Sequence, residues 1–168
     1  MEQHFVFTNE AEQLLGVLHL PERPARAGIV FLHGWPGYRV GAHRLAVKAA
    51  RAAAKRGFAS LRFDFRGRGD SEGATADANL VTMIADAVVA VEELRRRVDV
   101  ETIVYLGDCS GCEVAVGAGP LTPGLRAMAL WSAPIIGGER RAADTAKRWS
   151  IYSAYARKLF SVESWRKL

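Results

Sequence analysis

A strand, a turn and a helix predicted between residues 102 and 115 bring together the residue types best suited to nucleophilic chemistry. Glycines stand two positions before and two positions after Cys109, at Gly107 and Gly111. This is the G-x-S-x-G spacing of a nucleophile elbow, with cysteine in the position of serine. Because the turn is tight, glycine is favoured at both flanking positions. The pattern predicts that the thiol of Cys109 projects beyond the end of a strand, where it can act as a nucleophile.

The register of the turn favours Cys109 over Ser110 as the residue at its apex. With Ser110 at the apex, the flanking residues would be Asp108 and Cys112, whose side chains fit a tight turn poorly. A cysteine at a helix N-terminus also faces the positive end of the helix dipole. That position favours the thiolate, which is the nucleophilic form.

Two other interpretations of the same cysteines stay open. Cys109 and Cys112 have the C-x-x-C spacing of dithiol redox motifs at helix N-termini. Alternatively, both pack as small hydrophobic residues beside a strand. The redox interpretation explains neither Gly107 nor the motifs upstream of it. Two cysteines with no histidine nearby in the sequence make only half of a zinc ligand set, so we expect no metal.

The composition limits the class of protein. A chain of 168 residues that is 49% hydrophobic and 24% charged predicts one globular domain with its own core. The net charge of +5 includes clusters such as Arg95–Arg97, which we expect to lie on solvated helix faces. No basic stripe with interleaved aromatic residues indicates a nucleic-acid partner. The sequence shows neither a secretory signal nor an apolar run of membrane-spanning length, so we expect a cytoplasmic protein with reduced thiols.

Apolar runs that alternate with amphipathic stretches predict an α/β fold, in which helices flank a mostly parallel sheet. We expect strands at 4–8, 13–20, 28–32, 58–65, 102–107 and 128–131, and helices at 43–56, 79–97, from 111 onward and at 148–160. The first two strands form an N-terminal β-hairpin. In such sheets ligands bind beyond the carboxyl ends of the strands. The loops after Leu32, after Phe65 and at Cys109 all lie there, which predicts a site at that edge.

Three motifs in this order and spacing resemble the α/β-hydrolase superfamily, and the resemblance covers nearly the whole chain. They are His33-Gly34-Trp35-Pro36-Gly37, then DFRGRGDS at 64–71, then G-x-C-x-G at 107–111. The segments GYRVGAHR at 37–44 and SWRKL at 164–168 more narrowly resemble the exosortase A system-associated hydrolases. Those hydrolases also tend to carry cysteine at the elbow.

The resemblance implies a role for each matching residue. Cys109 would attack the carbonyl carbon of an ester, thioester or amide in a small acyl substrate. The backbone N–H groups of Trp35 and Ser110 would hold the resulting oxyanion. His33 and Gly34 would be structural, with His33 fixing the loop through hydrogen bonds, because the base of this fold follows the nucleophile in the chain.

The resemblance also implies a division of the chain and a set of supporting residues. Residues 1–136 would form the hydrolase core, and residues 137–168 would begin a helical lid over the site. Asp64, Arg66 and Asp70 would brace the loop that follows their strand. No cofactor is expected.

The third element of the fold's chemistry, a histidine after the nucleophile, is missing from the sequence. All four histidines precede the elbow: His4, His19, His33 and His43. We therefore expect a partial hydrolase, a hydrolase completed by a partner chain, or a non-catalytic binding or assembly module. The strand at 128–131 would then form an apolar sheet edge, from which we expect a homo-oligomer or aggregation.

Overall fold

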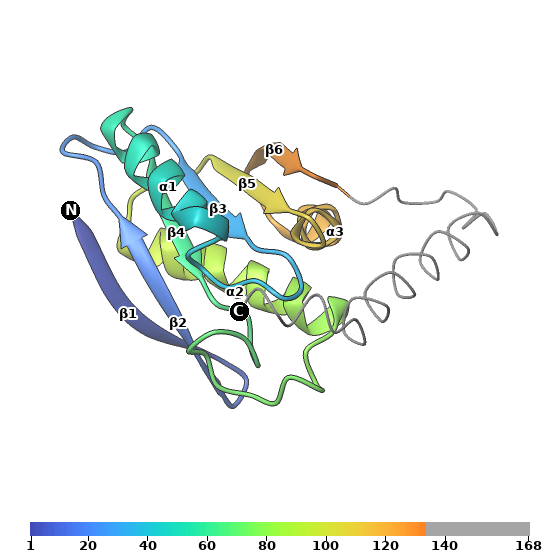
Figure 1. The fold of residues 1–168 in the computed structure, drawn as a ribbon. Coiled ribbons are helices and arrows are strands. Elements are labelled where there is room, and N and C mark those ends of the chain that lie inside the picture. Colours follow the sequence, from blue (N-terminus) through green and yellow to red (C-terminus); the bar gives the residue numbers. More distant parts are fainter. Residues whose placement is uncertain (134–168) are drawn as a thin grey trace, which may run out of the picture. The chain divides into compact units, whose positions relative to one another are not determined.

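The computed structural model describes residues 1–133, so the predicted lid at 137–168 and the helix at 148–160 lie outside the described residues. Within residues 1–133, six strands form one sheet in the order β1-β2-β4-β3-β5-β6 (Figure 1). The strands are β1 (Glu2–Asn9), β2 (Glu12–His19), β3 (Gly28–Leu32), β4 (Ala59–Phe63), β5 (Ile103–Asp108) and β6 (Leu125–Trp131). The helices are α1 (Leu45–Lys55), α2 (Leu80–Arg97) and α3 (Gly111–Ala118), with 3-10 turns η1 (Ala42–Arg44) and η2 (Gly119–Leu121).

The sheet is antiparallel at one side and parallel through its centre. β1 and β2 form a hairpin, and β2 pairs antiparallel with β4. The remaining neighbours, β4 with β3, β3 with β5 and β5 with β6, are parallel. This arrangement confirms the predicted α/β fold and its mostly parallel sheet. The strand at 28–32 lies in the middle of the sheet, as its continuous apolar sequence indicates.

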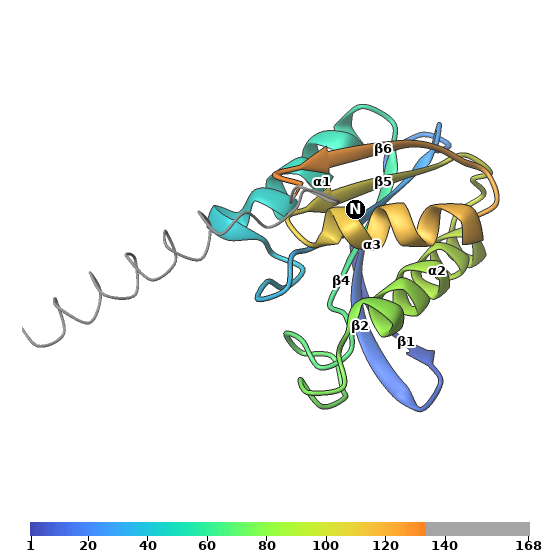
Figure 2. The ribbon, with the colours of Figure 1, turned by 90° about the vertical axis from the view of Figure 1, so that its right-hand side faces the viewer.

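Helices cover both faces of the sheet. α2 and α3 pack against each other on one face, and α1 lies on the other (Figure 2). The core beneath α2 buries Met83 and Leu94 against strand residues such as Val30, Phe63 and Ile103. The buried core is continuous from β1 to β5, so it supports the central strands along their length.

The predicted helix at 79–97 is confirmed, and its ends follow from its sequence. Asn79 is the N-cap, and its side chain accepts hydrogen bonds from the N–H groups of Val81 and Thr82. The Thr82 hydroxyl accepts from Asn79 N–H at 2.9 Å, which completes a capping box. Three arginines, Arg95–Arg97, occupy the last turn, where positive charge interacts favourably with the negative end of the helix dipole.

The predicted helix at 43–56 begins later than expected. His43 and Arg44 have left-handed backbone conformations, with φ of 50° and 60°, so the α-helix starts at Leu45. The helix ends at Lys55, one residue before the predicted Arg56, and Gly57 follows it as expected, with a φ of 85° that is readily accessible only to glycine. Within the described part of the chain, no helix combines the length and apolarity needed to cross a membrane.

β6 forms an edge of the sheet among the described strands. Its residues Met128, Leu130 and Trp131 are large, apolar and exposed. The strand extends from 125 to 131, three residues earlier than predicted, and is apolar as expected. Self-association of this chain stays a prediction.

Candidate active site

Cys109 lies at the turn between β5 and α3 in a conformation that few side chains adopt. β5 ends at Asp108 and α3 begins at Gly111, so only Cys109 and Ser110 form the turn. Cys109 has a φ of 52°, in the left-handed region. Such a conformation costs on the order of 1–3 kcal/mol in a non-glycine residue and persists only where the surroundings impose it. Cys109 N–H donates to the carbonyl of Trp131 at 2.9 Å, which ties the turn to β6.

The flanking glycines are required by close backbone contacts. A Cβ on Gly107 would lie 2.6 Å from the carbonyl oxygen of Gly111 and 2.8 Å from the nitrogen of Cys112. A Cβ on Gly111 would overlap the carbonyl oxygen of Leu32, at the end of β3. Because these neighbours are backbone atoms, they cannot move aside without distorting α3 or the sheet. The G-x-C-x-G pattern therefore follows from steric exclusion.

The loop after β3 passes directly beside the elbow. A Cβ on Gly34 would lie 2.9 Å from Cys109 Cβ and 3.7 Å from Cys109 Sγ. The next residue, Trp35, donates its backbone N–H to the side-chain oxygen of Ser110 at 2.6 Å. The two residues to which the resemblance assigns oxyanion contacts are thus neighbours. In this structure, however, the N–H of Trp35 already has an acceptor.

His33 joins the loops that follow β3 and β4. It is 8% exposed, and its Nδ1 donates to the carbonyl of Gly34 at 2.9 Å. Its Nε2 accepts from Phe65 N–H at 3.4 Å, and the two rings pack edge to face. Burial lowers the pKa of His33, so the neutral form with the proton on Nδ1 fits both contacts. Both ring nitrogens are engaged, which favours a structural role over a role as base.

A buried carboxylate braces the start of the loop after β4. Asp64 is fully buried and accepts from the backbone N–H and the guanidinium of Arg39. It also accepts from Asp70 N–H at 3.0 Å, and a Cβ on Gly69 would overlap its carboxylate. Arg39 in turn pairs with the side chain of Asp70 at 2.7 Å. These contacts fit the bracing role that the resemblance implies for Asp64 and Asp70.

A second buried ion pair fastens the same loop to α2. The Nε and Nη2 groups of Arg66 donate to Asp86 Oδ1 at 3.0 and 2.8 Å, and its backbone N–H donates to Asp86 Oδ2 at 3.0 Å. Asn9 and Glu10 of the hairpin complete the cluster, through Asn9 Nδ2 to Asp86 at 2.7 Å and Arg66 to Glu10 at 2.6 Å. Hydrogen bonds to Asp86 raise the pKa of Arg66. The guanidinium of Arg66 therefore stays protonated.

The two cysteines occupy different environments. Cys109 is exposed, whereas Cys112 is fully buried and both are free thiols. The Sγ of Cys112 lies 3.2 and 3.3 Å from the carbonyl oxygens of Gly107 and Trp131, which share its single proton. Burial raises the pKa of Cys112, which disfavours its thiolate. These features support packing as the role of Cys112 and give no support to a dithiol pair.

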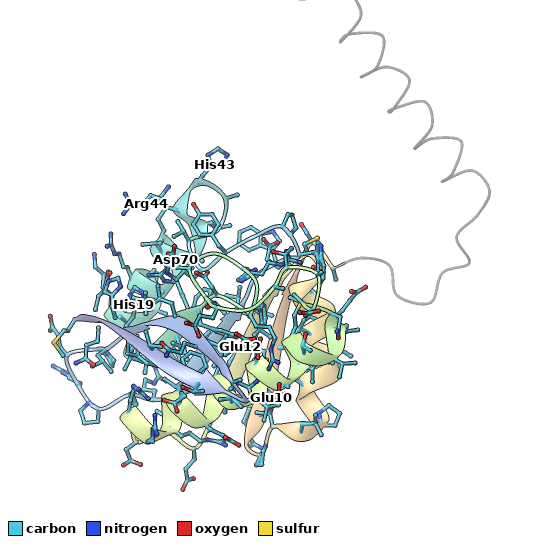
Figure 3. All side chains as sticks on the ribbon, turned by 90° about the horizontal axis from the view of Figure 1, so that it is seen from below. Glu10, Glu12, His19, His43, Arg44 and Asp70 are labelled. Carbon is cyan, nitrogen blue, oxygen red and sulfur yellow. The ribbon has the colours of Figure 1, made fainter. Side chains whose placement is uncertain are left out.

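None of the other histidines hydrogen-bonds a residue of the elbow in the described part of the chain. His4 is exposed on β1, and His43 projects outward with Arg44 from η1 (Figure 3). His19 is buried at the end of β2, where its Nε2 accepts from Arg62 Nε at 2.9 Å. Among residues 1–133, no three His, Cys, Asp or Glu side chains gather closely enough to bind a metal ion.

Two hollows in the surface flank the sheet at its opposite ends. An apolar cavity of about 40 Å³ lies between α1 and the carboxyl ends of β3 and β5. Its lining includes Leu32, Tyr38, Leu45, Leu106, Asp108 and Trp131. A groove of about 810 Å³ at the opposite end is lined by basic residues that include Arg23, Arg26, Arg51 and Lys55. Cys109 lines neither hollow, although the apolar cavity reaches its neighbour Asp108.

Sequence reasoning missed the tertiary contacts of these residues. The bond from Trp35 N–H to Ser110 Oγ joins residues 75 positions apart. The pairs of Asp64 with Arg39 and of Arg66 with Asp86 span 25 and 20 positions. The motif at 64–71 signals that a charged loop exists, but no local pattern identifies its partners.

Comparison with known proteins places these features in a family. The model of the family described as serine aminopeptidase, S33, matches residues 23–163. Human protein ABHD12B is 34% identical over 90 residues, which cover 54% of this chain and 24% of that protein. Zebrafish (Danio rerio) lysophosphatidylserine lipase ABHD12 is 32% identical over 87 residues, covering 52% and 22%. The matched part thus spans about a quarter of the length of these curated relatives.

A solved structure extends the likeness to nearly all of this chain. The α/β hydrolase GrgF from a Penicillium species is 18% identical, with a TM-score of 0.73 over 94% of this chain and 55% of that one. This likeness shows the shared fold. Since the family model covers most of the residues, the chain belongs to the serine aminopeptidase S33 family of α/β-hydrolases.

Proposed function

We propose that this protein cleaves ester, thioester or amide bonds of small acyl substrates through an acyl-cysteine intermediate on Cys109. The observation that carries the proposal is the strained turn at Cys109, with its φ of 52° and its exposed thiol at the end of β5. A residue is held in this conformation only when its surroundings impose it, and such positions cluster at functional sites. Membership of a hydrolase family supports the same class of chemistry.

The chemistry begins with the thiolate of Cys109, which is the nucleophilic form of a cysteine. Its sulfur forms a bond to the carbonyl carbon of the substrate, and the carbonyl π electrons move onto the oxygen. Hydrogen-bond donors beside the elbow stabilise that oxyanion. When the oxyanion collapses, the bond to the alcohol, thiol or amine breaks and the leaving group departs with the bonding electrons. Water then attacks the acyl carbon, the C–S bond breaks, and the acid and the Cys109 thiolate are released.

Acylation is the half-reaction that the described residues support best. It needs the thiolate and donors for the oxyanion, and a thiolate is a strong nucleophile without a base. Hydrolysis of the acyl-cysteine needs water activated by a base. None of the histidines in the described structure hydrogen-bonds an elbow residue, so we expect acylation by an activated ester to outpace deacylation in this chain.

The test is acetylation by p-nitrophenyl acetate, followed by release of p-nitrophenolate and by intact-protein mass spectrometry. We expect one acetyl group per chain, located on Cys109 by peptide mapping and absent from Cys109→Ala. Cys112→Ala is the matched control, because Cys112 is buried and should leave the adduct unchanged. A chain that acquires no acetyl group at Cys109 would point instead to a non-catalytic binding module and would overturn the proposal.

A further inference from the structure

Hydrogen bonds fix the peptide unit between Gly34 and Trp35 on both sides. Gly34 O accepts from His33 Nδ1 at 2.9 Å and from Gly37 N–H at 2.8 Å. On the other side of the same unit, Trp35 N–H donates to Ser110 Oγ at 2.6 Å. A trans peptide is planar, and its C=O and N–H point in opposite directions. Trp35 N–H therefore cannot turn toward another acceptor without breaking the two bonds at Gly34 O.

Shifting the whole loop is also hindered. Gly34 lies so close to the elbow that a Cβ there would be 2.9 Å from Cys109 Cβ and 3.2 Å from the carbonyl oxygen of Asp108. The ring of Trp35 packs beneath the guanidinium of Arg68, which lies 4.1 Å from the ring centre. The loop is thus confined from the elbow side and from the side of the loop after β4. The bond from Trp35 N–H to Ser110 Oγ is a fixed part of the site.

Ser110 offers two donors directly beside the nucleophile. Its hydroxyl carries one proton, and that proton stays available because Oγ acts as an acceptor toward Trp35 N–H. Its backbone N–H donates to no backbone acceptor among residues 1–133. A hydroxyl that accepts a hydrogen bond becomes a stronger donor, since bonds in a chain polarise one another. Both groups belong to the residue that follows Cys109.

We propose that the Ser110 hydroxyl is the second donor of the oxyanion hole, in the place that the motif assigns to Trp35 N–H. The oxyanion accepts from Ser110 N–H and from Ser110 Oγ–H, and Trp35 N–H holds the hydroxyl in place. As Cys109 Sγ bonds to the carbonyl carbon, the π electrons move onto the oxygen that Ser110 holds. When this pair re-forms the carbonyl, the leaving group departs with its own bonding electrons. This inference rests on the function proposed above.

The experiment compares two reactions of Cys109 in Ser110→Ala and Ser110→Thr. Acetylation by p-nitrophenyl acetate passes through an oxyanion, whereas alkylation by iodoacetamide proceeds by direct displacement and forms none. Removing one oxyanion donor slows such reactions by about 100-fold. In Ser110→Ala a water molecule can replace the hydroxyl, accepting from Trp35 N–H and donating to the oxyanion. Because this water restores part of the loss, we expect Ser110→Ala to acetylate about 10- to 100-fold more slowly. Its rate of alkylation should match that of the wild type, and Ser110→Thr should recover most of the acetylation.

Each other outcome overturns the inference in a recognisable way. An unchanged acetylation rate in Ser110→Ala would show that the hydroxyl does not hold the oxyanion. A faster rate would show that it blocks the site instead. An equal loss in both reactions would assign Ser110 to the reactivity of the thiolate or to folding, which circular dichroism separates. If the wild type alkylates but never acetylates, the proposed function itself fails.

Discussion

The elbow and the buried pair of His19 and Arg62 are held in place by different forces. At the elbow, Gly107 and Gly111 leave no room for a side chain because backbone atoms crowd them. Between β2 and β4, Arg62 Nε donates to His19 Nε2 at 2.9 Å, and both side chains are buried. Backbone contacts carry no charge, so the elbow should tolerate changes of pH but not of shape. The pair of His19 and Arg62 should be sensitive to changes of pH and less sensitive to changes of shape.

Gly111→Ala tests the steric part of this contrast, and we expect it to have the largest effect. The added Cβ would overlap the carbonyl oxygen of Leu32, so either α3 or the end of β3 must shift. We expect a loss of about 3 kcal/mol in the free energy of unfolding, at the upper end of the usual cost of overpacking. Urea denaturation followed by circular dichroism measures it. Acetylation of Cys109 should fall as well, because the shift alters the turn.

The matched control is Val116→Ala in the same helix, where the side chain is 46% exposed. It should change the unfolding free energy by no more than about 0.5 kcal/mol. Equal losses in the two variants would mean that α3 is simply sensitive to substitution. The crowding at Gly111 would then not be the reason for the glycine.

The same contrast explains which features were predictable from the sequence. The glycines of the elbow and the Asn79 cap act within a few residues, so local patterns identify them. The left-handed turn at His43 and Arg44 carries no glycine at either position, and the predicted helix therefore began too early. The pairing of His19 with Arg62 joins residues 43 positions apart and depends on the register of β2 against β4.

The oxyanion donors show the same limit at the site itself. The motif places Trp35 and Ser110 beside Cys109, and the structure brings these residues together. The motif describes backbone N–H groups only. It therefore gives no indication that a side-chain hydroxyl accepts from one of them, since that depends on how Gly34 is fixed by His33 and Gly37.

Lowering the pH should act on the buried pair of His19 and Arg62. Burial, and then the charge of Arg62, lower the pKa of His19 from 6.5 to about 4, despite Glu2 at 3.6 Å from its Nδ1. Between pH 6.5 and pH 4, His19 therefore binds a proton in the unfolded chain but stays neutral in the folded protein. The stability contributed by neutral His19 is complete above pH 6.5 and is lost as the pH falls toward 4. We expect a loss of about 2 kcal/mol between pH 7 and pH 5 from this group.

The measurement is the unfolding free energy at both pH values in the wild type and in His19→Gln, whose amide oxygen can accept from Arg62 without titrating. The variant should lose about 2 kcal/mol less than the wild type on acidification. His33, whose pKa burial also lowers, remains in both proteins and cancels in the comparison. Identical pH profiles would mean that His19 is protonated in the folded state and that Arg62 finds its acceptor elsewhere.

The smallest effect should come from Cys112→Ala, which alters the elbow without crowding it. The change removes a buried thiol and its hydrogen bonds to the carbonyls of Gly107 and Trp131. Loss of one small side chain and weak bonds should cost about 1 kcal/mol of unfolding free energy. Because the turn at Cys109 is held by backbone contacts that this change leaves in place, its rate of acetylation should stay within twofold of the wild type. A loss of acetylation as large as that in Gly111→Ala would show that the Cys112 side chain, and not backbone crowding, fixes the nucleophile.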